Sequence, residues 1–258
     1  MSLLIIIPAR HASTRFPGKP LAPLRGVDGR EKPLIQWSWE AARRAADLAR
    51  ILVATDDARI AAAVESFGGE VAMTSPFARN GTERCAEALD ASGLAPELVI
   101  NLQGDSPLVR RSDILALVET RRSTSEEVLT PYIACDAAME AALLAEDRAG
   151  RVGGTTVVTD QNGRALYFSK RPIPYRSAVE PRLKLHVGLY AYTPDALRRY
   201  ANGEPTPLEQ AEGLEQLRFL EQGIPVRAVE VEPRAGGFWE VNNPEDVKRV
   251  ETMLGTTG

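Results

Sequence analysis

Three positive charges follow the first apolar run of the sequence. The segment "IIIPARHASTRFPGKPL" places Arg10, Arg15 and Lys19 among prolines and a glycine. Phosphate oxygens are usually bound by several donors at once, with backbone N–H dipoles supplemented by the charge of arginine or lysine. Because proline and glycine restrict this loop, the three cations can converge, and we predict that they bind a triphosphate. The Walker pattern GxxxxGK[ST] is absent, and a solvated basic loop is the alternative interpretation.

A single carboxylate follows a later apolar run. In "ELVINLQGDSP", Asp105 comes directly after Gly104, which allows a tight turn and brings the backbone close to a ligand. Mg²⁺ prefers one or two carboxylates together with phosphate oxygens and water. Asp105 is therefore a candidate Mg²⁺ ligand, and the alternative is an aspartate that only begins the next turn.

The elements before these loops alternate between strand and helix. Buried strands are predicted at 3–7, 50–55, 70–73 and 97–102, and helices at 34–49, 57–68 and 81–93, with Asp56 as a helix cap. This alternation predicts an α/β fold with a mostly parallel, Rossmann-like mixed sheet covered by helices. Such sheets carry their sites at the carboxyl ends of the strands, where the basic loop and Asp105 fall.

The order changes after Asp105, where some strands are expected to be antiparallel. Strands are predicted in "EVLTPYIA", "GTTVVT", "ALYFSK", "KLHVGLYAYT", "PVRAVEV" and "FWEV", and "NPEDVKRVETML" predicts a closing helix. A period of two along "KLHVGLYAYT" puts His186 and Tyr190 on one face, either at a site or on a half-buried polar surface. The segment "PLEQAEGLEQLRFLEQG" predicts one amphipathic helix that contains Glu215 and Gln216, which could equally be solvated helix surface.

Length and composition limit the classes of function. The 258 residues fit a single domain, 1–258, with roughly 150–205 as a dimerisation or lid part. A net charge of -4 disfavours non-specific nucleic-acid binding. Cys85 and Cys135 show neither metal spacing nor a disulfide framework and are expected in the core. No apolar run is long enough to span a membrane, so we expect a cytoplasmic protein without nucleic-acid or membrane partners.

Several stretches together resemble the 3-deoxy-D-manno-octulosonate (KDO) cytidylyltransferases, also called CMP-KDO synthetases. They occur in the order "IIIPARHASTRFPGKPL", "NGTERCAE", "NLQGDSP", "LYFSKRPIP", "LHVGLYAY" and "PLEQAEGLEQLR", and they cover nearly the whole chain. The resemblance implies a single-domain nucleotidyltransferase, usually a homodimer, that requires Mg²⁺. In that reaction a hydroxyl of an acidic sugar attacks the α-phosphorus of CTP, and pyrophosphate leaves.

The resemblance also implies roles for individual residues. The catalytic residues would be Arg10, Arg15, Lys19 and Asp105. The nucleotide would be bound by Pro8, Ala9, Arg10, Arg15, Lys19, Gly81, Thr82, Arg84 and Gln103. The acidic acceptor would be bound by Gln103, Lys170, His186, Tyr190, Glu215 and Gln216. The metal would be bound by Asp105, with Asn242 as a candidate second ligand.

Three positions depart from the family pattern. Asn242 stands where the family motif "VDTPEDL" has a second metal-binding aspartate, so metal affinity should fall unless Glu240 or a substrate group compensates. Ser106 replaces the glutamate of "QGDEP", and Lys170 replaces the arginine of "FSR", which is not an equivalent exchange at a carboxylate or phosphate.

These departures keep other functions open. One is a family member with a different small acid as acceptor, specifically a phosphonoformate cytidylyltransferase of phosphonate antibiotic biosynthesis. Another is a non-catalytic homologue that binds a nucleotide. A third is a nucleotidyltransferase that uses GTP or UTP with a sugar phosphate, but such enzymes commonly open with a "GxGTR"-like loop that "PARHASTR" lacks.

Overall fold

The structure is a computed structural model that describes residues 1–12, 15–175, 182–233 and 239–254. Among these residues, ten strands form one mixed sheet in the order β5-β4-β1-β6-β11-β7-β10-β8-β9, with β12 paired to β7. The strands are β1 Leu3–Ala9, β4 Ala49–Thr55, β5 Glu70–Met73, β6 Leu98–Leu102, β7 Val128–Ala134, β8 Thr156–Thr159, β9 Ala165–Ser169, β10 Lys184–His186, β11 Leu189–Tyr192 and β12 Val226–Glu230. This sheet confirms the predicted α/β class.

The first half of the sheet is parallel. Strand β1 pairs in parallel with β4 and β6, and β4 with β5, so the carboxyl ends of these strands meet at one edge. Strand β11 is antiparallel to both β6 and β7. Because Leu189 lies opposite Leu102, the start of β11 reaches the same edge as the end of β6. The late segment around Gly188 therefore lies beside the turn that carries Asp105.

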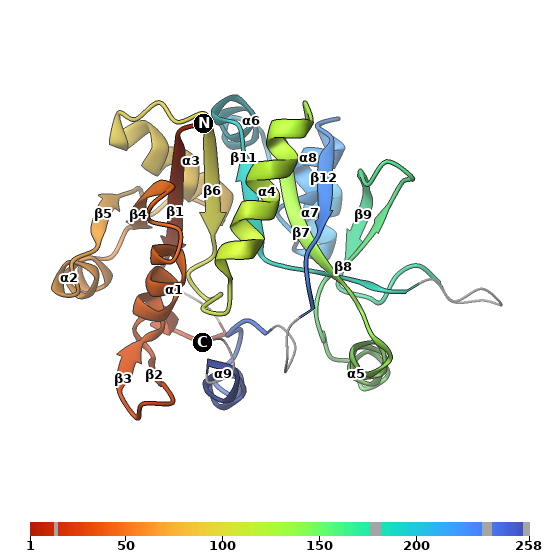
Figure 1. Ribbon diagram of the computed structural model, residues 1–258, viewed down its shortest axis with the longest axis horizontal. Coiled ribbons are helices and arrows are strands. Elements are labelled where there is room, and N and C mark those ends of the chain that lie inside the picture. The colour runs from red at the N-terminus through yellow and green to blue at the C-terminus, as the bar shows by residue number, and fades with distance from the viewer. Residues whose placement is uncertain (13–14, 176–181, 234–238, 255–258) are drawn as a thin grey trace.

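Helices cover both faces of the sheet (Figure 1). They are α1 Leu34–Arg43, α2 Ala58–Ser66, α3 Gly81–Ser92, α4 Arg111–Ser123, α5 Ala137–Arg148, α6 Pro194–Ala201, α7 Pro207–Glu212, α8 Leu217–Glu221 and α9 Asp246–Leu254. In Figure 1, α4 lies in front of the sheet, α3 lies behind it, and α9 lies below the carboxyl ends of β1 and β6. No helix among the described residues is long and apolar enough to cross a membrane.

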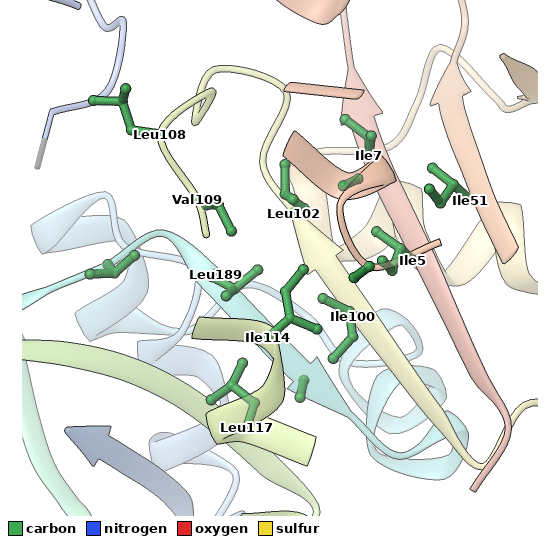
Figure 2. Close-up of a cluster of buried hydrophobic side chains, with 14 of the residues drawn as sticks. Ile5, Ile7, Ile51, Ile100, Leu102, Leu108, Val109, Ile114, Leu117 and Leu189 are labelled. Atoms are coloured by element: carbon green, nitrogen blue, oxygen red, sulfur yellow. The ribbon is translucent and has the colours of Figure 1, made fainter. Parts of the chain in front are cut away.

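Two hydrophobic clusters explain the layers. Ile5 and Ile7 of β1 face the cluster that contains α1, α2, α4 and α9, whereas Leu4 and Ile6 face the cluster that contains α3, α6 and α8. Since successive strand side chains point to opposite faces, a strand buried on both faces reads as a continuous apolar run. Figure 2 shows the first cluster, in which Ile114 of α4 lies beside Ile100 and Leu189. Cys85 and Cys135 are buried and free, as expected.

Several predicted boundaries were wrong in the first half of the chain. The helix predicted at 34–49 ends at Arg43, and turns follow. A hairpin of β2 Pro23–Arg25 and β3 Glu31–Pro33 precedes it, and the sequence analysis did not predict this hairpin. Asp57, not Asp56, caps α2, because its carboxylate accepts from the backbone N–H groups of Arg59 and Ile60.

Two later elements are broken where continuous ones were predicted. "KLHVGLYAYT" forms β10 and β11 with a break at Val187 and Gly188. The predicted helix around Gln216 is two short helices, because Gly213 takes a left-handed conformation (φ +61°) and ends α7. Glu215 and Gln216 thus lie between α7 and α8. In "FWEV", Trp239–Val241 do not form a strand, and Phe238 lies outside the described residues.

Candidate active site

The basic loop begins at the carboxyl end of β1. The backbone N–H of Gly18 donates to the carbonyl of His11 at 3.0 Å, and Gly18 has a φ of +72° that favours glycine. Lys19 begins a short 3-10 helix, Lys19–Leu21, and its side chain is mostly buried. Arg10 and Arg15 are exposed. The loop thus holds one cation in place at the edge of the sheet and presents two to solvent.

Lys19 contacts Asp105 directly. Its Nζ lies 2.5 Å from Asp105 Oδ2, and the two side chains are 15% and 22% exposed. The turn that carries Asp105 packs tightly on β1, since a Cβ at Gly104 would lie only 2.7 Å from the carbonyl oxygen of Pro8. The buried Ser38 hydroxyl donates to the Gly104 carbonyl at 2.9 Å. The structure therefore brings together the loop lysine and the carboxylate that the sequence analysis predicted separately.

A third segment reaches this pair from the C-terminal part of the chain. The N–H of Val241 donates to the carbonyl of Asp105 at 3.1 Å. Beside it, Glu240 Oε1 accepts from the Ser106 hydroxyl and from the Gly188 N–H, both at 3.2 Å. Burial raises the pKa of Glu240 to about 7; the negative charge of Asp105 adds to the increase, and the Lys19 ammonium opposes it.

The sequence analysis gave Glu240 no specific role beyond a compensating acid. Its neighbour Asn242, the candidate metal ligand, accepts through Oδ1 from Arg15 Nη2 at 3.3 Å. The structure thus places Asn242 beside the basic loop, whereas it is Glu240 that lies close enough to Asp105 for the two carboxylates to interact electrostatically.

The start of α3 forms the neighbouring part of the site. A Cβ at Gly81 would lie 3.0 Å from the amide atoms of Gln103. Glu215 joins these residues, since it accepts from the Thr82 N–H at 3.0 Å and from Gln103 Nε2 at 3.2 Å. Burial raises the pKa of Glu215. Gly81, Thr82, Gln103 and Glu215 therefore form one contact group at the edge of the sheet.

Arg84 lies apart from this group. It is 2% exposed, and its Nη1 donates to Thr74 Oγ1 at 2.6 Å and to the Ser75 carbonyl at 3.3 Å. The same nitrogen lies 3.4 Å from a carboxylate oxygen of Asp56. These contacts hold the loop after β5 against α3, and a nucleotide-binding role for Arg84 stays a prediction.

Aromatic residues line the part of the site around Gln216. The rings of His186 and Tyr190 are 5.4 Å apart, although they belong to different strands. The Tyr190 hydroxyl donates to Gln216 Oε1 at 3.2 Å, while the buried Gln216 Nε2 has no partner among the described residues. Tyr190 also stacks on Tyr192 with a centroid distance of 5.8 Å. The break at Gly213 turns Gln216 inward. In the single helix that the sequence predicted, Gln216 would instead have faced solvent.

Lys170 lies between the basic loop and the turn after α7. A Cβ at Gly213 would lie 2.8 Å from its Nζ, and its backbone N–H donates to Glu212 at 3.0 Å. Burial lowers the pKa of Lys170, and the positive charge of Arg15 lowers it further. Lys170 therefore lies near Arg15 in surroundings that disfavour its charged form.

His186 is a neutral imidazole. Burial lowers its pKa from the ordinary 6.5 to about 3. Thr130 Oγ1 lies 2.8 Å from His186 Nε2 and also donates to the Leu189 carbonyl at 2.8 Å. Since a hydroxyl has one hydrogen, Nε2 must donate to Oγ1, and Nδ1 is left as an acceptor. His186 can thus accept a hydrogen bond from a ligand but cannot supply positive charge.

This neutral state predicts a pH dependence of stability. Because the folded-state pKa of about 3 lies below 6.5, the unfolded chain takes up a proton first as the pH falls. Stability from this group is complete above pH 6.5 and is lost towards pH 3, with about 2 kcal/mol lost by pH 5. We expect urea unfolding at pH 7.5 and 5 to show a smaller fall for His186→Gln than for the wild type. Equal falls in the two proteins would contradict the neutral assignment. Other titrating groups, such as Glu240, whose pKa is raised and not lowered, are present in both proteins, so their contributions cancel in the comparison.

The residues present fit a hard divalent cation. Asp105 and Glu240 offer carboxylate oxygens, and Asn242 offers an amide oxygen nearby on the chain. Within the described residues no group of three or more His, Cys, Asp or Glu side chains could hold a metal. Mg²⁺ commonly takes one or two carboxylates and completes its coordination with phosphate oxygens and water. The donor set thus suits a cation that arrives with a phosphate ligand.

Comparisons with known proteins match nearly the whole chain to one family. Residues 4–230 match the sequence model of a family described as "Cytidylyltransferase". The chain is 43% identical over 261 residues to the 3-deoxy-manno-octulosonate cytidylyltransferase of Maricaulis maris, covering 100% of this chain and 99% of the relative. It is 42% identical over 267 residues to the protein of the same name from Aliivibrio fischeri, with 98% and 99% covered.

A solved structure gives the same result. It is described as CMP:2-keto-3-deoxy-manno-octonic acid synthetase complexed with CTP, and it covers 98% of both chains with a TM-score of 0.82 and 38% identity. Sequence and fold thus match over nearly the whole chain. The chain therefore belongs to the 3-deoxy-manno-octulosonate cytidylyltransferase family of nucleotidyltransferases.

Proposed function

We propose that the chain transfers CMP from CTP to KDO and releases pyrophosphate, with Mg²⁺ bound at Asp105. The observation that carries this proposal is the contact between Lys19 and Asp105, with 2.5 Å between Nζ and Oδ2. It puts a cation for the triphosphate beside a carboxylate for the metal. The octulosonate names of the relatives reported above support the acceptor.

The basic loop would bind and neutralise the triphosphate. Lys19 would exchange Asp105 for phosphate oxygens, and the exposed Arg10 and Arg15 would close on the leaving pyrophosphate. Catalysis of this kind is mostly positioning and electrostatic stabilisation. Mg²⁺, when bound, would neutralise phosphate charge and lower the pKa of the attacking hydroxyl. No strong protein base is then needed.

The acceptor would lie on the aromatic side of the site. Lys170 is the cation available for a sugar carboxylate, and the neutral His186 would accept a hydrogen bond through Nδ1. Gln216 Nε2 is a buried donor without a partner among the described residues, so a ligand oxygen would satisfy it. Tyr190 hydrogen-bonds Gln216 and Gln103 hydrogen-bonds Glu215, so the adjacent residues 215 and 216 link this side to the nucleotide side. The homodimer and the 150–205 dimerisation or lid part stay predictions.

The test is pyrophosphate release from CTP and Mg²⁺, with KDO and phosphonoformate offered separately. We expect turnover with KDO at a kcat/KM at least about 10²-fold above that with phosphonoformate, as for a site built to bind a substrate's hydroxyl groups. GTP and UTP in place of CTP serve as nucleotide controls. Turnover with phosphonoformate alone would overturn the acceptor, and no release with either acid would favour a non-catalytic homologue. The relatives reported above give the phosphonoformate hypothesis no support.

A further inference from the structure

The residues around Glu240 bind and orient its carboxylate. Its Oε1 accepts two hydrogen bonds, from the Ser106 hydroxyl and the Gly188 N–H. Position 188 has room for this oxygen only because it is glycine, since a Cβ there would overlap Oε1. Two donors on one oxygen fix the orientation of the carboxylate and leave Oε2 without a donor among the described residues.

The chain around Glu240 is held on both sides. Trp239 Nε1 donates to Asp246 Oδ1 at 2.7 Å, and the Asn242 N–H donates to Asp246 Oδ2 at 2.9 Å. Val241, between them, donates to the Asp105 carbonyl at 3.1 Å. The first turn of α9 and the Asp105 turn thus set the position of Glu240 relative to Asp105.

Asn242 has different contacts from those of Glu240. Its Oδ1 already accepts from Arg15 Nη2 at 3.3 Å, and it carries no charge. Ser106, at the position where the family pattern has glutamate, donates to Glu240 instead of offering a carboxylate of its own. A glutamate at 106 would put two like charges together, which is unfavourable without a cation. A serine at 106 is therefore compatible with the Glu240 carboxylate beside it.

We propose that Glu240 supplies the second carboxylate for the divalent cation at Asp105, and that Asn242 positions Arg15 instead of ligating the metal. This inference rests on the proposed function, because it assumes a metal at Asp105. Asp105 and Glu240 would each offer one oxygen, and phosphate oxygens of CTP and water would complete the shell.

The experiment measures Mn²⁺ binding, not activity. Mn²⁺ is titrated into the full chain saturated with a CTP analogue whose α and β phosphorus atoms are joined by methylene, and free Mn²⁺ is read by electron paramagnetic resonance. Glu240→Gln should weaken Mn²⁺ binding by about tenfold or more, since even outer-shell changes cost that much. Glu245→Gln, an exposed glutamate in the same segment, is the matched control and should bind as the wild type does.

The Asp105→Asn variant distinguishes a failure of the Glu240 role from a failure of the proposed metal site at Asp105. If Glu240→Gln binds Mn²⁺ like the wild type and Asp105→Asn does not, Glu240 is no ligand and the proposed metal at Asp105 stands. If both variants bind like the wild type, the metal at Asp105 fails as well, and so does this inference. Glutamine keeps an oxygen for Ser106 and Gly188, so the variant should fold. If it does not, Glu240→Asp, which shortens the reach by one methylene, should still weaken binding several-fold, and unchanged binding would overturn the inference.

Discussion

Asp105→Asn should reduce Mg²⁺-dependent pyrophosphate release by at least about 10³-fold, to near background. Asparagine has the same shape, so the turn after Gly104 and its contact with β1 should persist. What it removes is the negative charge that faces Lys19 and that would hold the cation. The measurement is initial rate against Mg²⁺ concentration with CTP and KDO at saturation.

The control for this variant is Asp195→Asn. The Asp195 side chain is 84% exposed at the start of α6, far along the chain from the site. It should leave both the rate and the Mg²⁺ dependence unchanged. Because an exposed ion pair contributes little to stability, Asp195→Asn should not shift Tm by much. An Asp105→Asn enzyme with a rate within threefold of the wild type would remove Asp105 from the metal role.

Lys19→Ala should lower kcat/KM for CTP by about 10²–10³-fold, the usual cost of one preorganised charged donor. The Nζ is 2.5 Å from Asp105, so its removal also leaves that carboxylate without its cation. Lys19→Arg should recover little, because a planar guanidinium does not take the place of a compact ammonium in a mostly buried position. The measurement is kcat and KM for CTP at fixed KDO.

Lys248→Ala, on the exposed face of α9, is the matched control for the lysine. It should keep wild-type kinetics, which would show that total charge is not the cause. A loss of only a few-fold in Lys19→Ala, with native circular dichroism, would mean that Arg10 and Arg15 suffice for the triphosphate.

The sequence predicted the parallel part of the fold well. Strands such as Leu3–Ala9 are buried on both faces and therefore read as apolar runs, and Gly68 marks the end of α2, whereas the cap at its start is Asp57 and not the predicted Asp56. Local patterns could not place β11 between β6 and β7, because that pairing joins segments far apart in the chain. They also missed the β2–β3 hairpin, whose strands are short and partly exposed.

The sequence predicted only part of the site, again because contacts between distant segments leave no local pattern. Lys19 and Asp105 can be recognised from the sequence because each lies in a loop that follows a buried strand. Glu240 cannot, because its significance comes from Ser106 and Gly188, which only the folded chain brings to it. Gln216 was placed in a helix because a leucine period continues across Gly213, whose left-handed backbone breaks that helix.

In the free protein, Lys19 and Asp105 neutralise each other. A triphosphate that arrives without metal must draw Lys19 away and leave Asp105 facing further negative charge. A metal that arrives alone must displace an ammonium from its carboxylate. In the proposed reaction, only the metal–nucleotide complex would give both side chains a new partner of opposite sign, so the affinities for metal and nucleotide would be thermodynamically linked. Under the proposed function, the resting ion pair would therefore favour the chelated nucleotide over either component.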